Sequence, residues 1–275
     1  MGKEFSSKLI ACDVDGTLLD SNGRLRDRTK EALLTASEAG ATITLATGRD
    51  WLAVEYLVKE LPSVSFAACV NGAEVRTAKG EKLYSHELGK DLAVQIIRRI
   101  RTSITGVSMG ASINGRLVGE QSISDALPPT PDGIESFAEK IVPDLLMEVN
   151  QSVQDLVIYH QDFHERLEDL YVLVRSAIDM NDAIVAYSGL PMIEILPRGA
   201  GKGSALSWLA NHLEISQHQV VAFGDNVNDI SMLRWAGIGV AMGNASIELL
   251  KYADQRTLTN DQDGVAVWIE KKLSE

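Results

Sequence analysis

The sequence predicts an α/β protein with a doubly wound, Rossmann-like parallel sheet, because short apolar segments alternate with amphipathic helical segments. Near the N-terminus, an apolar segment at 8–12 precedes a helical pattern that is closed by Gly40, and a second apolar segment follows at 41–46. A helical segment at 51–61 then precedes a third strand-like segment at 64–70. This strand–helix–strand order is typical of a parallel sheet.

The middle of the chain has a different pattern of apolar and polar segments, and the alternation of strands and helices seen near the N-terminus returns after it. The middle contains a helix around 92–101, a hairpin that turns at Asn114-Gly115 and a proline-rich loop at 128–131. Strands are expected after it at 192–196, 220–224 and 239–242. The sequence therefore predicts a discontinuous core domain, residues 1–82 and 190–275, with an inserted α/β cap domain at 83–189.

Composition narrows the class of protein. The 275 residues are 45% hydrophobic and 23% charged, which is typical of a soluble globular protein. A formal net charge of −12 argues against a nucleic-acid partner, because such binding depends on Lys and Arg. No apolar stretch approaches the roughly 20 residues of a membrane span. Cys12 and Cys69 lie in apolar segments and are expected to be buried free thiols, so we expect a cytoplasmic protein with no membrane attachment and no obligate protein partner.

The run D-V-D-G-T at 13–17 places two carboxylates two residues apart, directly after an apolar strand. If the backbone stays extended, Asp13 and Asp15 share a face. One carboxylate can then attack phosphorus while the other donates a proton to the leaving oxygen. A calcium loop is excluded, because Leu18 and Arg24 occupy the positions that require Gly and Glu. A simple acidic turn remains the alternative.

A second polar cluster, G-D-N-V-N-D at 224–229, also follows a strand directly. Mg²⁺ prefers octahedral oxygen ligands supplied by one or two carboxylates, with waters and a substrate phosphate completing the shell. Asp13 and Asp225 suit that role. Capping of a helix N-terminus by the Asp and Asn side chains is the alternative explanation.

Two further segments can bind phosphate. Lys202 lies in the run G-A-G-K-G-S before an expected helix, where it can bring positive charge to a phosphate. A Walker A motif is excluded, because Leu196 and Gly203 occupy two of its required positions. Thr47 and Gly48 follow another strand and can donate a hydroxyl and an amide. A solvated lysine and an ordinary loop are the alternatives.

Together these four signals resemble the haloacid dehalogenase superfamily, specifically its Cof-type phosphatases with a large α/β cap (subclass IIB). The resemblance covers the core, whereas the cap matches only in size and position. It implies that Asp13 forms an aspartyl-phosphate and that Asp15 acts first as the acid and then as the base. It also implies that Thr47 and Lys202 hold the phosphoryl group.

The same resemblance implies a Mg²⁺ site and a phosphate cradle. The metal ligands would be the Asp13 carboxylate, the Asp15 main-chain oxygen and Asp225, supported from behind by Asp229. The cradle would include the residues Val14, Gly48 and Asn228. Asn71 looks like the family residue that touches substrate, and Arg49 either touches substrate or has a structural role.

The sequence therefore predicts a magnesium-dependent phosphoric monoester hydrolase that acts on a small phosphorylated metabolite, with sugar phosphates as the first candidates. Flavin mononucleotide, pyridoxal phosphate and phosphoglycolate stay open. A phosphomutase would share the aspartyl-phosphate but return the phosphoryl group before water attacks. A non-catalytic metabolite-binding module on the same fold is the alternative from a different class.

Overall fold

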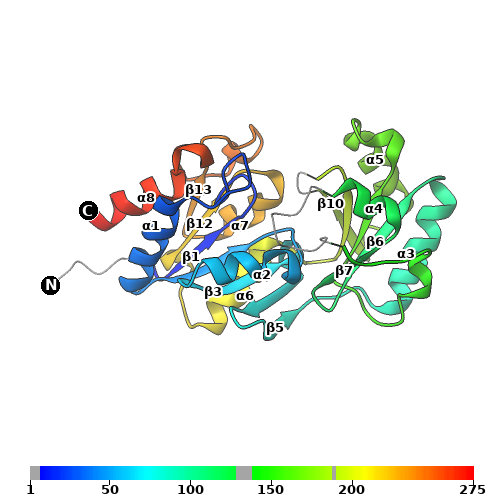
Figure 1. The fold of residues 1–275 in the computed structure, drawn as a ribbon, viewed down its shortest axis with the longest axis horizontal. Helices are drawn as coiled ribbons and strands as arrows, with labels where there is room; N and C mark the ends of the chain where they lie inside the picture. The colour runs from blue at the N-terminus through cyan, green and yellow to red at the C-terminus, as the bar shows by residue number, and fades with distance from the viewer. Residues whose placement is uncertain (1–6, 128–137, 188–189) are drawn as a thin grey trace. The chain divides into compact units, whose positions relative to one another are not determined.

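The computed structural model describes residues 7–127, 138–187 and 190–275, which form two compact units (Figure 1). Of these residues, the first unit contains 7–49, 54–83 and 201–275, and the second contains 50–53, 84–127, 138–187 and 190–200. The proline-rich loop expected at 128–131 lies outside the described residues. Among the described helices, none is long and apolar enough to cross a membrane.

The first unit is built on an eight-stranded sheet that joins the two ends of the chain. Strand β1 (Leu9–Cys12) pairs in parallel with β2 (Thr42–Ala46) and with β12 (Val220–Gly224). All four residues of β1 are buried, which explains its uninterrupted apolar sequence. The strand order is β14-β13-β12-β1-β2-β3-β4-β5, with β3 (Val64–Cys69), β4 (Glu74–Thr77), β5 (Lys82–Ser85), β13 (Ile238–Ala241) and β14 (Gln255–Arg256).

Helices connect the parallel strands of this sheet. Helices α1 and α8, from opposite ends of the chain, pack against each other and lie side by side in Figure 1. The α-helices of this unit are α1 (Asp27–Glu38), α2 (Trp51–Glu60), α6 (Lys202–His212), α7 (Ile230–Trp235) and α8 (Gly264–Ser274), although the first three residues of α2 fall in the second unit. The 3₁₀ turns are η1 (Val70–Gly72), η4 (Gln217–Gln219), η5 (Val227–Asp229), η6 (Leu249–Lys251) and η7 (Asn260–Gln262). This alternation confirms the predicted doubly wound α/β fold.

The strand register brings three loops to one edge of the sheet. Cys12 aligns with Leu45 on β2 and with Phe223 on β12. Parallel strands end at the same edge, which is where open α/β sheets bind ligands. The loops that begin just after β1, β2 and β12 therefore start close together, and they carry the polar motifs of the sequence.

The second unit has a six-stranded sheet of order β10-β11-β9-β6-β7-β8. Its pairs are antiparallel except for β7 with β8. The hairpin predicted at Asn114-Gly115 is confirmed, and both residues have positive φ, as a tight two-residue turn requires. The strands are β6 (Ser108–Ile113), β7 (Arg116–Gly119), β8 (Ala138–Ile141), β9 (Asp155–Tyr159), β10 (Ala183–Ala186) and β11 (Ile193–Pro197).

The core of the second unit lies between one face of this sheet and two helices. In α3, Ala93, Ile96, Ile97 and Ile100 are buried at the spacing of one helical face. This confirms the helix expected around 92–101. The helices of the unit are α3 (Lys90–Ser103), α4 (Gln121–Ala126), α5 (Leu167–Ala177), η2 (Leu145–Met147) and η3 (Gln161–Phe163).

One strand belongs to a different sheet from the one that the sequence predicted. The segment expected at 192–196 as a core strand is β11, which pairs antiparallel with β9 and β10 in the second unit. Ile193 and Ile195 pack into the apolar core of that unit. The sequence of a short apolar strand is compatible with either sheet, so only the strand pairing shows to which sheet it belongs. The first unit resumes at Gly201 rather than near 190.

Candidate active site

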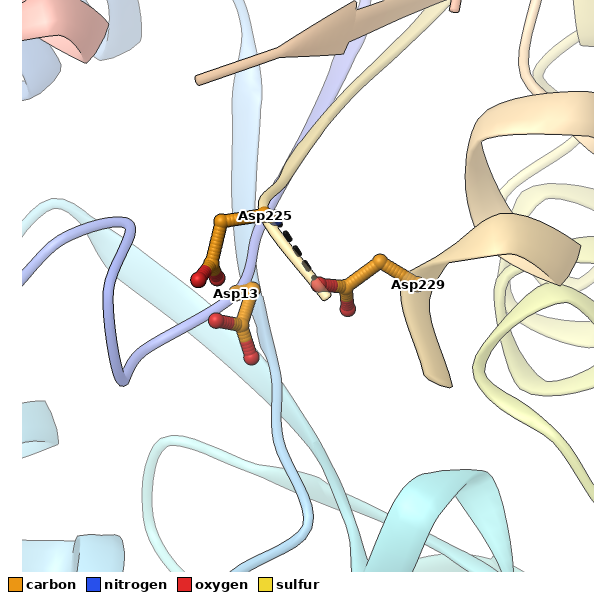
Figure 2. A group of neighbouring side chains, drawn as sticks. All are labelled: Asp13, Asp225 and Asp229. Carbon is orange, nitrogen blue, oxygen red and sulfur yellow. Dashed lines mark hydrogen bonds between the residues drawn. The ribbon is translucent and has the colours of Figure 1, made fainter. Parts of the chain in front are cut away.

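Three aspartates from two distant segments meet at the carboxyl end of the parallel sheet. Asp13 follows β1 directly, Asp225 follows β12, and Asp229 ends the short η5 turn (Figure 2). One carboxylate oxygen from each lies within 4.8 Å of those of the other two. Asp13 and Asp229 are buried and Asp225 is partly exposed. Within the described residues, this is the one cluster of acidic, histidine or cysteine side chains close enough to hold a metal ion.

Lys202 joins two of these carboxylates. It is the first residue of α6, and its side chain is only 1% exposed. Its Nζ donates hydrogen bonds of 2.6 Å to Asp13 Oδ1 and 2.6 Å to Asp229 Oδ1. A buried ammonium requires such partners, because removal from water is costly for an unpaired charge.

Asp229 shapes the loop as well as pairing with Lys202. Its Oδ2 accepts hydrogen bonds from the backbone amides of Asp225 at 3.0 Å and Asn226 at 3.1 Å. Both oxygens of Asp229 therefore already have protein donors. A Cβ added at Gly224 would lie 2.5 Å from the Asp229 Cβ, so the close approach requires glycine there. This arrangement suits Asp229 to a supporting position behind Asp13 and Asp225.

The cluster carries more negative than positive charge. Burial, and next the charge of Asp229, raise the pKa of Asp13, while Lys202 acts in the opposite direction. Burial and Asp229 also raise the pKa of Asp225 to about 6. Burial lowers the pKa of Lys202, but the charges of Asp13 and Asp229 outweigh burial and raise it. One ammonium thus faces three carboxyl groups, and a divalent cation would offset the remaining charge.

The loop after β1 is held against Asp225. Gly16 has a φ of +82°, and a Cβ there would lie 2.4 Å from Asp225 Oδ2. Thr17 Oγ1 donates a 3.2 Å hydrogen bond to Asp225 Oδ1. The Asn244 side-chain amide donates to the Gly16 carbonyl at 2.8 Å, and that of Asn260 donates to the Leu19 carbonyl at 2.9 Å.

Thr17, Asn244 and Asn260 were missed by reasoning from the sequence. Asn244 lies just beyond β13, the next parallel strand after β12. A polar residue beyond the end of another parallel strand was the signal that could have identified it. Asn260 lies in η7 and its contacts depend on tertiary structure alone.

The loop after β2 joins a strained turn. Asn71 donates its backbone amide to the Thr47 carbonyl at 2.9 Å, and its Oδ1 accepts from the Asn228 side chain at 3.0 Å. Val70 and Asn71 both have a φ of 50°, which is unfavourable for a β-branched residue such as Val70. A Cβ at Gly72 would lie 2.3 Å from the Gly201 carbonyl oxygen. The turn is therefore wedged against the start of α6.

Three candidate phosphate donors lie on the loops after β1 and β2. Thr47 is buried just after β2, and its Oγ1 accepts from the Arg49 amide at 3.1 Å. In the described part of the chain, the backbone amides of Val14 and Gly48 have no protein acceptor. Unpaired amides beside a buried carboxylate can donate to the oxygens of an anion.

Asp15 and Arg49 form an ion pair at the exposed side of the site. Arg49 donates from Nε to Asp15 Oδ2 at 2.9 Å and from Nη2 to Asp15 Oδ1 at 2.6 Å. The sequence left open whether Arg49 touches the substrate or has a structural role. In the structure its side chain contacts Asp15. A third residue, Tyr56, completes this arrangement with a hydroxyl 3.2 Å from Arg49 Nη1.

Comparison with known proteins gives one consistent family. The family model of haloacid dehalogenase-like hydrolases matches residues 10–269. Phosphatase YwpJ of Bacillus subtilis is 31% identical, over 94% of this chain and 97% of its own. The HMP-PP phosphatase of an Enterobacter species is also 31% identical, over 89% of this chain and 87% of its own.

A solved structure shows the same fold at similar identity. A haloacid dehalogenase-like hydrolase from Bacteroides thetaiotaomicron has a TM-score of 0.80 and 30% identity, and the match covers 96% of this chain and 99% of that protein. The match therefore spans both units and both sheets. The chain belongs to the haloacid dehalogenase-like hydrolases and is a Cof-type phosphatase, which is a phosphoric monoester hydrolase.

Proposed function

We propose that the chain is a Mg²⁺-dependent phosphatase that removes the phosphoryl group of a small metabolite through an aspartyl-phosphate on Asp13. The observation that carries the proposal is the position of the Asp13 carboxylate. It is buried at the end of β1, bonded to Lys202 on one oxygen and adjacent to Asp225. Such a carboxylate is oriented, and it is surrounded by the groups that phosphoryl transfer requires.

In the first step, an Asp13 oxygen attacks phosphorus and the bond from phosphorus to the leaving oxygen breaks. Asp15 donates a proton to that oxygen, which leaves as an alcohol. In the second step, water attacks the same phosphorus and gives its proton to Asp15. The bond from phosphorus to Asp13 then breaks, which releases phosphate and restores both carboxyl groups.

Charge stabilisation would come from Lys202, which is bonded to Asp13, and from donors on the loops after β1, β2 and β12. The Lys202 ammonium, the Thr47 hydroxyl and the amides of Val14 and Gly48 are donors for the phosphoryl oxygens. Asn228, oriented by Asn71, supplies a further amide group on the same side. Lys202 requires little rearrangement during the reaction, because Asp13 and Asp229 already hold its ammonium, and the Thr47 backbone is held by a hydrogen bond from the Asn71 amide.

The acidic cluster fits Mg²⁺. Its oxygens are hard ligands, and its excess negative charge calls for a cation. The Asp13 and Asp225 carboxylates, with the Asp15 main-chain oxygen, would hold the ion, and Asp229 would support them from behind. When bound, Mg²⁺ would neutralise charge on the phosphoryl group.

Sugar phosphates are the substrate class that we propose first. A relative named as an HMP-PP phosphatase makes other small phosphorylated metabolites the next class to test. The net charge of −12 supports a small substrate rather than a nucleic acid. Cys12 and Cys69 are buried and form no disulfide within the described residues, which supports a reducing setting, the cytoplasm.

The division into a hydrolase core and an inserted cap domain belongs to the same proposal. The division into compact units supports a boundary near 83 at the start of the cap, within strand β5. At its end, the pairing of β11 supports a boundary near 200 rather than 189.

Phosphate release from a panel of sugar and cofactor phosphates, with and without Mg²⁺, tests the proposal. We expect Mg²⁺-dependent release by the wild type and a loss of at least about a thousandfold in Asp13→Asn. Asp27→Asn is the matched control, because the Asp27 side chain on α1 is 94% exposed. Isomer exchange without phosphate release would instead indicate a phosphomutase. Binding without turnover would indicate a metabolite-binding module.

A further inference from the structure

A chain of three polar side chains ends on Asp15. Tyr56 lies on α2, and its hydroxyl is 3.2 Å from Arg49 Nη1. Arg49 in turn contacts both oxygens of Asp15, at 2.9 Å and 2.6 Å. Exposure falls along this chain, since the side chain of Asp15 is 56% exposed and that of Arg49 is 19% exposed. An exposed carboxylate is thus tied to a more buried cation.

The backbone of Arg49 is held on both sides. Its amide donates to Thr47 Oγ1 at 3.1 Å, and its carbonyl accepts from the Val70 amide at 2.9 Å. The guanidinium group is planar, and its two parallel hydrogen bonds define the plane and direction of the carboxylate that it binds. Arg49 therefore has the rigidity needed to orient another residue.

We infer that Arg49 and Tyr56 are positioning residues for Asp15: Tyr56 anchors the guanidinium, and the guanidinium fixes the orientation of the Asp15 carboxylate between proton transfers. The inference depends on the proposed phosphatase function, in which Asp15 transfers the proton. Neither residue needs to touch the substrate for this role. Tyr56 has no other assigned part in the site.

The physical reason is the exposure of Asp15. A half-exposed carboxylate on a loop samples several rotamers, and only some of them bring it to the leaving oxygen. A two-point hydrogen bond removes most of that freedom in advance. The ion pair also engages both oxygens, so Asp15 must release at least one of them when it carries a proton. Arg49 therefore holds the ionised form in place after each proton has been donated.

Dependence on the leaving group tests this role. The value of kcat/KM includes the steps up to departure of the leaving group. The alkoxide of an alkyl phosphate needs a proton from Asp15 at that stage. The p-nitrophenolate of p-nitrophenyl phosphate leaves without one. We expect Tyr56→Phe to lower kcat/KM about fivefold for an alkyl phosphate and less than about twofold for p-nitrophenyl phosphate. Arg49→Met should lower the alkyl value further, by about a hundredfold, and Arg49→Lys should restore part of it.

Two controls separate positioning from general damage. Tyr252 contacts Arg234 through its ring at another place in the same unit, and Tyr252→Phe keeps that contact. This variant should leave kcat/KM unchanged for both substrates. In an Arg49→Met background, Tyr56→Phe should have no further effect, because Tyr56 acts through Arg49.

The outcomes are distinct. Equal losses for alkyl and aryl substrates, or a raised KM with unchanged kcat in Arg49→Met, overturn the inference and indicate a structural role or a substrate contact. If the wild type releases no phosphate from any substrate, the proposed function fails and this inference fails with it. An active wild type with unequal losses supports both.

Discussion

The two units treat buried polar side chains in opposite ways. In the first unit, Asp13 and Asp229 are buried in the loops that follow parallel strands, and both are bonded to the buried Lys202 at the start of α6. In the second unit, Asp155 and Ser112 are buried within neighbouring strands, and Ser112 donates hydrogen bonds to Asp155 from its amide, at 3.0 Å, and from its side chain. The first arrangement forms a network, and the second is a local pair.

Sheet topology explains the difference. Parallel strands deliver all their following loops to one edge, so segments far apart in the sequence converge there. Asp13 follows β1 and Asp225 follows β12, and a carboxylate oxygen of one lies within 4.8 Å of a carboxylate oxygen of the other. Neighbouring antiparallel strands end at opposite edges, so their loops do not gather in this way. A charged cluster is therefore built more readily on the parallel sheet, and the members of that cluster depend on one another.

Removing the central cation should have the largest effect. Lys202→Met leaves Asp13 and Asp229 buried without their shared partner, so we expect the free energy of unfolding to fall by about 3–5 kcal/mol and phosphatase activity to be lost. Urea denaturation measures the loss of stability. Added Mg²⁺ should recover part of it, because the ion supplies the missing positive charge.

Lys59→Met is the matched control for this prediction. Lys59 pairs with Glu55 on the surface of α2, and such pairs contribute about 0–1 kcal/mol. If Lys202→Met were no more destabilising than Lys59→Met, the buried cluster would not depend on its cation and the contrast between the units would fail.

The sequence predicts most of the first unit and little of the second. Asp13, Thr47 and Asp225 could be placed, because each follows an apolar strand and parallel strands end together. Lys202 could be placed by its glycine-flanked position at the start of a helix. No comparable motif exists in the second unit, where only helix periodicity and the Asn114-Gly115 turn carried information.

What could not be predicted depends on tertiary contact. The apolar sequence of the strand at Ile193–Pro197 is compatible with either sheet, and only its pairing with β9 assigns it to the sheet of the second unit. The contact from Tyr56 to Arg49 depends on side-chain direction, which spacing does not supply. The burial of Asp155 was also missed, because an aspartate at the start of a strand usually faces solvent.

The local pair in the second unit makes a smaller prediction, on stability and pH. Burial raises the pKa of Asp155 from 3.8 to about 6, and the hydrogen bonds from the Ser112 side chain and amide only partly offset this. Between pH 4 and pH 6 the folded chain holds a proton that the unfolded chain has released. The free energy of unfolding contributed by this group therefore falls as the pH rises through that window.

Asp155→Asn should remove this fall, since asparagine does not titrate. As the pH rises from 4 to 6, we expect the free energy of unfolding of the variant to rise relative to that of the wild type by up to about 3 kcal/mol. Urea denaturation at several pH values measures this change. Asp182→Asn, at an exposed position in the same unit, is the control and should follow the wild-type curve. Parallel curves for Asp155→Asn and wild type would show that Asp155 is hydrated in solution.

The smallest effect should come from a single amide that links distant loops of the first unit. Asn244 donates to the Gly16 carbonyl at 2.8 Å, and its Oδ1 accepts from the Asn260 amide at 3.0 Å. Asn244→Ala removes both bonds and should cost about 1–2 kcal/mol of stability. Because Gly16 adjoins the proposed main-chain metal ligand of Asp15, the variant should also need about fivefold more Mg²⁺ to reach half of its maximal thermal stabilisation.

Asn22→Ala, at an exposed position on the same loop, separates loop anchoring from general loosening. It should change neither the stability nor the Mg²⁺ requirement. A loss of stability in Asn244→Ala with an unchanged Mg²⁺ requirement would mean that the loop keeps its shape without the anchor. The convergence of the loops would then be a property of the sheet rather than of the hydrogen bonds between them.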